Sequence, residues 1–124
     1  MTRTASIPEN RDLEQTGSPL ENTVTIQFNF EWDPAKARGN QKKHGLSFEQ
    51  ATNVFRDSRA ISVFDEDHSE EEERWITVGS TSQGTVMVVV HTFRELSSGD
   101  EATIRIISAR RATRRELKDY EANL

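Results

Sequence analysis

Arginines recur at the ends of apolar stretches in the second half of this chain, and they suit phosphate chemistry. Arg74 precedes "WITVGS", Arg94 follows "TVMVVVHTF", Arg105 lies inside "TIRIIS", and Arg110 comes shortly after it. Guanidinium groups bind phosphate oxygens bidentately and stabilise charge that develops on a phosphorane. Because neighbouring strand ends meet in an antiparallel sheet, we expect Arg94, Arg105 and Arg110 to act on one phosphate. Their alternative role is salt bridging to an acidic loop of the same chain.

Other side chains suit proton transfer and the holding of RNA. A histidine, lysine or glutamate can move protons, and we assign this role to Lys43, His44 or Glu73. His44 equally suits a helix cap, and Glu73 equally suits the end of a solvated acidic run. Indole stacks on an unpaired base, and cations take the backbone. We therefore expect RNA to be held by three residues: Lys42, Arg74 and Trp75. Successive strand residues point to opposite faces, so at most one of Arg74 and Trp75 faces the groove.

Composition bounds the class of protein. The chain has 124 residues, of which 33% are hydrophobic and 30% charged, as expected for one small domain with a modest core. It has no cysteine, which excludes disulfides and thiolate metal sites. No apolar run has the length of a membrane span, and the N-terminus lacks the apolar core of a secretory signal. We expect a soluble cytoplasmic protein without metal or cofactor; His68 and its acidic neighbours are read as a solvated loop.

The net charge of -5 is unevenly distributed. Residues 1–33 hold six acids and two bases, and "DEDHSEEEE" at 65–73 holds seven acids and no base. The remaining residues carry 14 basic against eight acidic side chains. A phosphate-binding surface is therefore compatible with an acidic chain.

Local patterns place these residues on elements. Residues 1–22 are polar and aperiodic, and we expect a disordered extension before a domain at 23–124. The alternation of "VTIQFNF" at 24–30 predicts a strand. Asp33 and Pro34 then begin a helix that Gly45 ends. A capping box at Ser47 begins a second helix, and Trp32 and Phe48 are expected in the core.

Four further strands and one helix complete the prediction. The strands are 60–64, 74–80, 85–93 and 103–108, the segments 65–73 and 94–102 are loops, and the last helix is 110–121. The order β-α-α-β-β-β-β-α favours an α+β fold, with an antiparallel sheet and the two N-terminal helices on one face. The last helix carries a cationic stripe at three- and four-residue steps, which suits an acidic partner: Arg111, Arg114, Arg115 and Lys118.

Several ordered segments of this chain resemble the BrnT family of type II toxins. They are "FEWDPAKARGNQKKHGLSFEQATNVFRDS", "HSEEEERWITVGS" and "RIISARRATRRELKDYE", and they run from Phe30 to Glu121. The resemblance implies a fold like the RelE/ParE toxins and an endoribonuclease that inhibits translation. It also implies a BrnA-like antitoxin, a ribbon-helix-helix protein that neutralises the toxin and binds DNA, so that DNA is contacted only through the antitoxin.

The function predicted from residues and resemblance together is metal-independent RNA cleavage. The RNA's own 2'-hydroxyl attacks the adjacent phosphate, and the protein moves protons and stabilises the phosphorane. The alternative is a non-catalytic module whose cations only hold nucleic acid or a partner protein.

Overall fold

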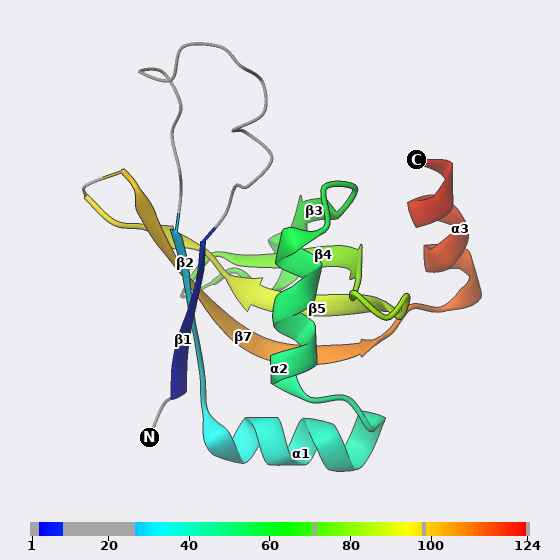
Figure 1. The fold of residues 1–124 in the computed structure, drawn as a ribbon, viewed down its shortest axis with the longest axis horizontal. Coiled ribbons are helices and arrows are strands. Elements are labelled where there is room, and N and C mark those ends of the chain that lie inside the picture. Colours follow the sequence, from blue (N-terminus) through cyan, green and yellow to red (C-terminus); the bar gives the residue numbers. More distant parts are fainter. Residues whose placement is uncertain (1–2, 9–26, 71, 98, 124) are drawn as a thin grey trace.

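The computed structural model describes residues 3–8, 27–70, 72–97 and 99–123, with the backbone alone for 3–8 (Figure 1). The described strands are β1 (Arg3–Pro8), β2 (Gln27–Trp32), β3 (Ile61–Phe64), β4 (Arg74–Ser80), β5 (Val86–Thr92), β6 (Arg94–Glu95) and β7 (Glu101–Arg111). The helices are α1 (Pro34–His44), α2 (Phe48–Ala51) and α3 (Arg114–Ala122), with short 3₁₀ segments η3 (Thr52–Arg56) and η4 (Glu66–His68). Among these residues, no helix is long and apolar enough to cross a membrane.

The strands form one mixed sheet in the order β1-β2-β7-β5-β4-β3, and β6 pairs with the far end of β7. The α+β class is confirmed, but the prediction of a wholly antiparallel sheet is wrong, because β2 runs parallel to β7. Alternation in the sequence reveals which residues face the core but carries no information about a strand's partner. A parallel pair needs a long crossover, which here is everything between Asp33 and Asp100.

Local signals fix the first helix. The carboxylate of Asp33 accepts a hydrogen bond from the Ala35 amide at 2.9 Å, and Gly45 ends α1 with a φ of 70°. Buried Asn40 then ties α1 to the sheet. Its amide donates to the carbonyl of Ala109 at 2.8 Å, and its oxygen accepts from the Ala109 amide at 3.0 Å.

The core lies between the sheet and the segment from α1 to η3. Trp32 and Phe48 are 3% and 0% exposed, which confirms their predicted place, and their rings meet edge to face at 5.9 Å. The Ser47–Gln50 capping box that begins α2 is also formed. The other core side chains come from β2, β5, β7 and the helical segment: Phe30, Leu46, Ala51, Val54, Met87, Val89, Ile104, Ile106 and Ala109.

The two sides of β7 differ in chemistry. Ile104 and Ile106 face the core, so Arg105 between them faces away, as the sequence predicted. We call this side the outer face. A bulge follows: Val90 pairs with Ser108 and His91 pairs with Ile106, which leaves Ile107 as the extra residue on β7.

Two boundaries differ from the predicted ones near the C-terminus. The last strand extends to Arg111, so Arg110 and Arg111 are strand residues and do not belong to the helix. Pairing with β5 continues to Met87, and α3 begins only at the capping box of Thr113 and Glu116. In Figure 1, α3 lies at the end of the sheet away from β1 and β2.

The predicted loop at 94–102 is shorter than expected, because Arg94 and Glu95 form β6 and β7 begins at Glu101. The expectation of disorder over residues 1–22 also differs for Arg3–Pro8. These six residues pair antiparallel with β2 as strand β1, since the outer edge of β2 offers unpaired backbone groups. The rest of that segment, and the first residues of the strand predicted at 24–30, lie outside the described residues.

Candidate functional site

Two predicted catalytic arginines meet at a cavity of about 260 Å³ on the outer face. Its lining residues come from β2, the acidic loop, the end of β5, β6 and β7: Glu31, Glu72, Glu73, Thr92, Phe93, Arg94, Thr103 and Arg105. We call it the arginine cavity. Predicted residues Arg94, Arg105 and Glu73 are therefore brought together, although they lie up to 32 residues apart in the sequence.

The register of the sheet explains this convergence. Arg94 on β6 pairs with Thr103 on β7, two residues before Arg105 on the same face. On the other side of β7, Glu31 is the parallel partner of Arg105. Thr92 links β5 to the site, because its hydroxyl accepts a hydrogen bond from the Arg105 amide at 3.4 Å. Backbone pairing on both sides of β7 thus fixes the positions of the Cα atoms from which these side chains extend.

An acidic side chain already contacts the central arginine. Glu72, in the acidic loop, forms an ion pair with the guanidinium of Arg105, whose side chain is 33% exposed. This is the contact that the salt-bridge interpretation predicted for the arginines. Arg74 lies in an adjoining cavity of about 360 Å³ with Glu72 and other residues of the same loop. The acidic loop therefore approaches both Arg74 and Arg105.

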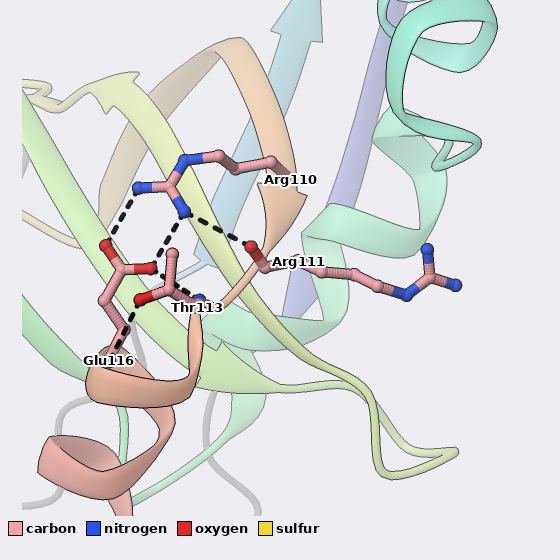
Figure 2. Close-up of polar contacts among 4 residues, drawn as sticks. All are labelled: Arg110, Arg111, Thr113 and Glu116. Atoms are coloured by element: carbon pink, nitrogen blue, oxygen red, sulfur yellow. Dashed lines mark hydrogen bonds and ion pairs between the residues drawn. The ribbon is translucent and has the colours of Figure 1, made fainter.

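Arg110 is not among the residues that line the arginine cavity. Its guanidinium binds the carboxylate of Glu116 at 2.8 and 2.9 Å, and it also donates to the carbonyl of Arg111 at 3.2 Å (Figure 2). Glu116 at the same time accepts from the amide of Thr113 at 2.8 Å. The hydrogen bonds from Arg110 lower the pKa of Glu116 to about 2, and the pair raises the pKa of Arg110. In this structure Arg110 joins β7 to the start of α3.

Trp75 also lies away from the cavity. It pairs with His91 on the core side of β4, and its ring meets Phe64 at 5.4 Å. Arg74 pairs with Thr92 on the outer face, so the two successive residues do point apart as predicted. The aromatic ring at the arginine cavity is that of Phe93, which is 39% exposed.

The remaining predicted residues lie on α1, at the end of β7 and on α3. Lys42, Lys43 and His44 form the last turn of α1, and none of them lines the arginine cavity. The cations assigned to a partner protein are all exposed, on the last residue of β7 and on α3: Arg111, Arg114, Arg115 and Lys118. Figure 2 shows the side chain of Arg111 extending away from the pair formed by Arg110 and Glu116.

A chain of polar side chains, with His91 and Thr77 buried, lies behind the cavity. Nε2 of His91 bonds to the hydroxyl of Thr77 at 2.7 Å, which bonds in turn to Ser62 at 2.7 Å. Nδ1 donates to the carbonyl of Thr92 at 3.0 Å. Burial lowers the pKa of His91 to about 4. A neutral imidazole therefore supports Thr92, which is itself a lining residue.

A second and larger cavity, of about 510 Å³, lies beside α3 and does not include the predicted site. At one wall, Asp57 accepts hydrogen bonds from the Tyr120 hydroxyl at 2.6 Å and the Ser80 amide at 2.8 Å. Burial opposes the charge of Asp57, but these bonds and the Arg59 amide hold its pKa below the usual value. Burial and Asp57 raise the pKa of Tyr120 to about 12. This arrangement fastens α3 to η3 and β4.

Sequence reasoning missed several residues of the arginine cavity: Glu31, Glu72, Thr92, Phe93 and Thr103. The alternation in β2 contained the signal for Glu31, since Phe30 and Trp32 face the core on either side of it. No local pattern distinguishes Glu72 from Glu73, because both belong to one acidic run. Within the described residues, no group of three His, Asp or Glu side chains has the geometry of a metal site.

This chain is similar to a solved structure and to a protein family. The crystal structure of the Brucella abortus ribonuclease toxin BrnT is similar, with 22% identity over 67% of this chain and 94% of that one and a TM-score of 0.47. No curated protein sequence matches the chain. Residues 32–116 match the model of a family described as "Ribonuclease toxin, BrnT, of type II toxin-antitoxin system". That match covers more than half of the chain, which therefore belongs to the BrnT family of ribonuclease toxins.

Proposed function

We propose that this ribonuclease toxin is an endoribonuclease that cleaves RNA without a metal ion, at the arginine cavity. The observation that carries the proposal is the convergence of Arg94 and Arg105 in one cavity with carboxylates and an exposed aromatic ring. Guanidinium groups bind and stabilise a phosphorane, carboxylates accept protons, and a ring such as that of Phe93 stacks on a base. A relationship to the RelE-like toxins and inhibition of translation belong to the same proposal.

The reaction uses the 2'-hydroxyl of the RNA as nucleophile. A carboxylate takes the proton of this hydroxyl while the 2'-oxygen attacks phosphorus. The P–O5' bond then breaks. Arg94 and Arg105 stabilise the negative charge that develops on the non-bridging oxygens. Of the three proton-transfer residues expected from the sequence, Glu73 lines the cavity, whereas Lys43 and His44 lie at the end of α1.

The test uses purified protein, a labelled single-stranded RNA and EDTA. We expect discrete cleavage that survives EDTA and leaves 2',3'-cyclic phosphate or 3'-phosphate ends. Arg94→Ala is expected to lose the activity, while Arg38→Ala, an exposed arginine of α1, is the matched control. Cleavage that stops with EDTA would contradict the metal-free reaction. Binding of RNA without any cleavage would favour the non-catalytic module.

The partner that neutralises the toxin is proposed to be a BrnA-like antitoxin with a ribbon-helix-helix domain. The support is the exposed cationic stripe of α3 opposite its buried side, where Tyr120 is 7% exposed. Such a stripe suits an acidic surface and mainly sets the association rate. Arg114→Glu with Arg115→Glu should slow association with the antitoxin and weaken its salt dependence, yet leave RNA cleavage intact. Loss of cleavage instead would place RNA on α3.

A further inference from the structure

We infer that Glu31 is the general base that takes the proton from the 2'-hydroxyl of RNA. This inference rests on the proposed function and adds a catalytic residue to it. Glu31 lines the arginine cavity and is the parallel partner of Arg105 in the sheet register. The side chain of Glu31 therefore extends from the strand position next to Arg105, whose guanidinium binds the phosphate in the proposed reaction.

Three carboxylates line the cavity, and their surroundings separate them. Glu72 forms the ion pair with Arg105, so its carboxylate already occupies a position where phosphate would bind. Glu73 lies in the segment before β4 and is exposed. Glu31 is half-buried, and its side chain takes part in no hydrogen bond or ion pair found between described residues. It is the cavity carboxylate that is neither paired with Arg105 nor on a loop.

The backbone holds Glu31 more firmly than either loop glutamate. Phe30 and Trp32, on both sides of it, are 0% and 3% exposed in the core. β2 is paired along both edges, with β1 on one side and β7 on the other. A general base must lie within hydrogen-bond reach of the proton it removes, and a site on a rigid strand keeps that geometry better than one on a loop.

Cleavage then requires two proton transfers, and a third restores Glu31. The carboxylate of Glu31 accepts the 2'-hydroxyl proton while the O2'–P bond forms. The P–O5' bond breaks, and the departing 5'-oxygen takes a proton from water that enters the open cavity. The products are a 2',3'-cyclic phosphate end and a 5'-hydroxyl end. Glu31 returns to the carboxylate by releasing its proton to solvent.

The test compares Glu31→Gln with Glu73→Gln on an RNA that the wild type cleaves. Loss of a general base lowers the rate on the order of 10²–10⁴-fold. We expect that loss in kcat for Glu31→Gln, with KM changed little. The rise of the cleavage rate with pH on the acidic side of its pH profile, which we call the acidic limb, should be gone. Glu73→Gln should keep that limb. If Glu31→Gln keeps the limb and the rate, the inference is wrong.

A second substrate separates a base from an acid. When sulfur replaces the bridging 5'-oxygen, the leaving group departs without a proton, so a variant that lacks the acid recovers its rate. We expect Glu31→Gln to stay slow on this RNA, and recovery would overturn the inference. Glu31→Asp, which keeps a carboxylate, should retain part of the rate and the acidic limb. If the wild type itself forms no cyclic phosphate, the proposed function fails and not this assignment alone.

Discussion

The outer face of the sheet holds two arginine–glutamate pairs that are built differently. Arg110 and Glu116 meet through two parallel hydrogen bonds across six residues of chain, and Glu116 also caps α3. Arg105 and Glu72 meet through one guanidinium nitrogen across 33 residues, and Glu72 is in a loop with its side chain 42% exposed. The first pair is part of the fold, whereas in the proposed function an RNA phosphate replaces Glu72 in the second. Under that proposal, one arginine of β7 serves structure and another serves ligand binding.

Of the substitutions that test this comparison, loss of Arg105 should have the largest effect, and the effect should be on RNA cleavage. Removing one donor that stabilises transition-state charge costs on the order of 10²–10³-fold in kcat. We expect Arg105→Ala to show that loss in single-turnover RNA cleavage, with a midpoint of urea unfolding close to that of the wild type. Arg115→Ala, an exposed residue of α3, is the control. Activity within a few-fold of the wild type would remove Arg105 from the reaction.

Loss of Arg110 should give the opposite result. Arg110→Ala leaves Glu116 without its bidentate partner, and we expect about 1–2 kcal/mol less free energy of unfolding, given the partial exposure of the pair. RNA cleavage by the folded variant should stay within a few-fold of the wild type. Urea unfolding and initial cleavage rates check both statements. A large loss of activity in a stable variant would return Arg110 to the phosphate site.

Features encoded by neighbouring residues were predictable from the sequence. Both ends of α1 were predicted correctly, because residues next to each end determine it: Asp33 and Pro34 at the start and Gly45 at the finish. The role of Arg110 was harder to predict, because β7 extends past it only through pairing with β5. Likewise, Glu31 reaches the arginine cavity through a strand partner distant in the sequence, Arg105, and Phe93 lines it from the short link between β5 and β6. Trp75 was assigned to RNA by its residue type, while strand register places it beside Phe64.

Acid should affect the Arg110–Glu116 pair in a defined range of pH. The pKa of Glu116 falls from 4.5 to about 2 in the fold, chiefly through its bonds with Arg110. A lowered pKa stabilises the folded state above the unfolded value and loses that contribution as pH falls through the folded value. Glu116→Gln can keep the capping box but not the charge. Its melting temperature should lie a few degrees below that of the wild type at pH 7, and the gap should close as pH falls from about 4.5 towards 2. A gap independent of pH would mean that the charge contributes nothing.

Neutralising Glu72 should have the smallest effect, and that effect should be a gain in RNA affinity. An exposed ion pair is worth up to about 1 kcal/mol, which corresponds to about fivefold in an equilibrium constant. If RNA binds Arg105 as proposed, it must displace Glu72, so Glu72→Gln should bind RNA a few-fold more tightly. Fluorescence anisotropy with a 2'-O-methyl RNA, which cannot be cleaved by its own 2'-oxygen, measures this affinity.

The control for that experiment is Glu66→Gln, which removes the same charge from η4 but from a residue that lines neither the arginine cavity nor the adjoining one around Arg74. An equal gain in both variants would mean that the acidic loop repels RNA through its general field, which 0.5 M salt screens. A gain confined to Glu72→Gln would mean that this side chain competes with phosphate for Arg105. Weaker binding after the Glu72 substitution would contradict competition, because it would show that Glu72 orients Arg105 for RNA. The comparison of the two pairs would then change, since both glutamates would be positioning their arginines.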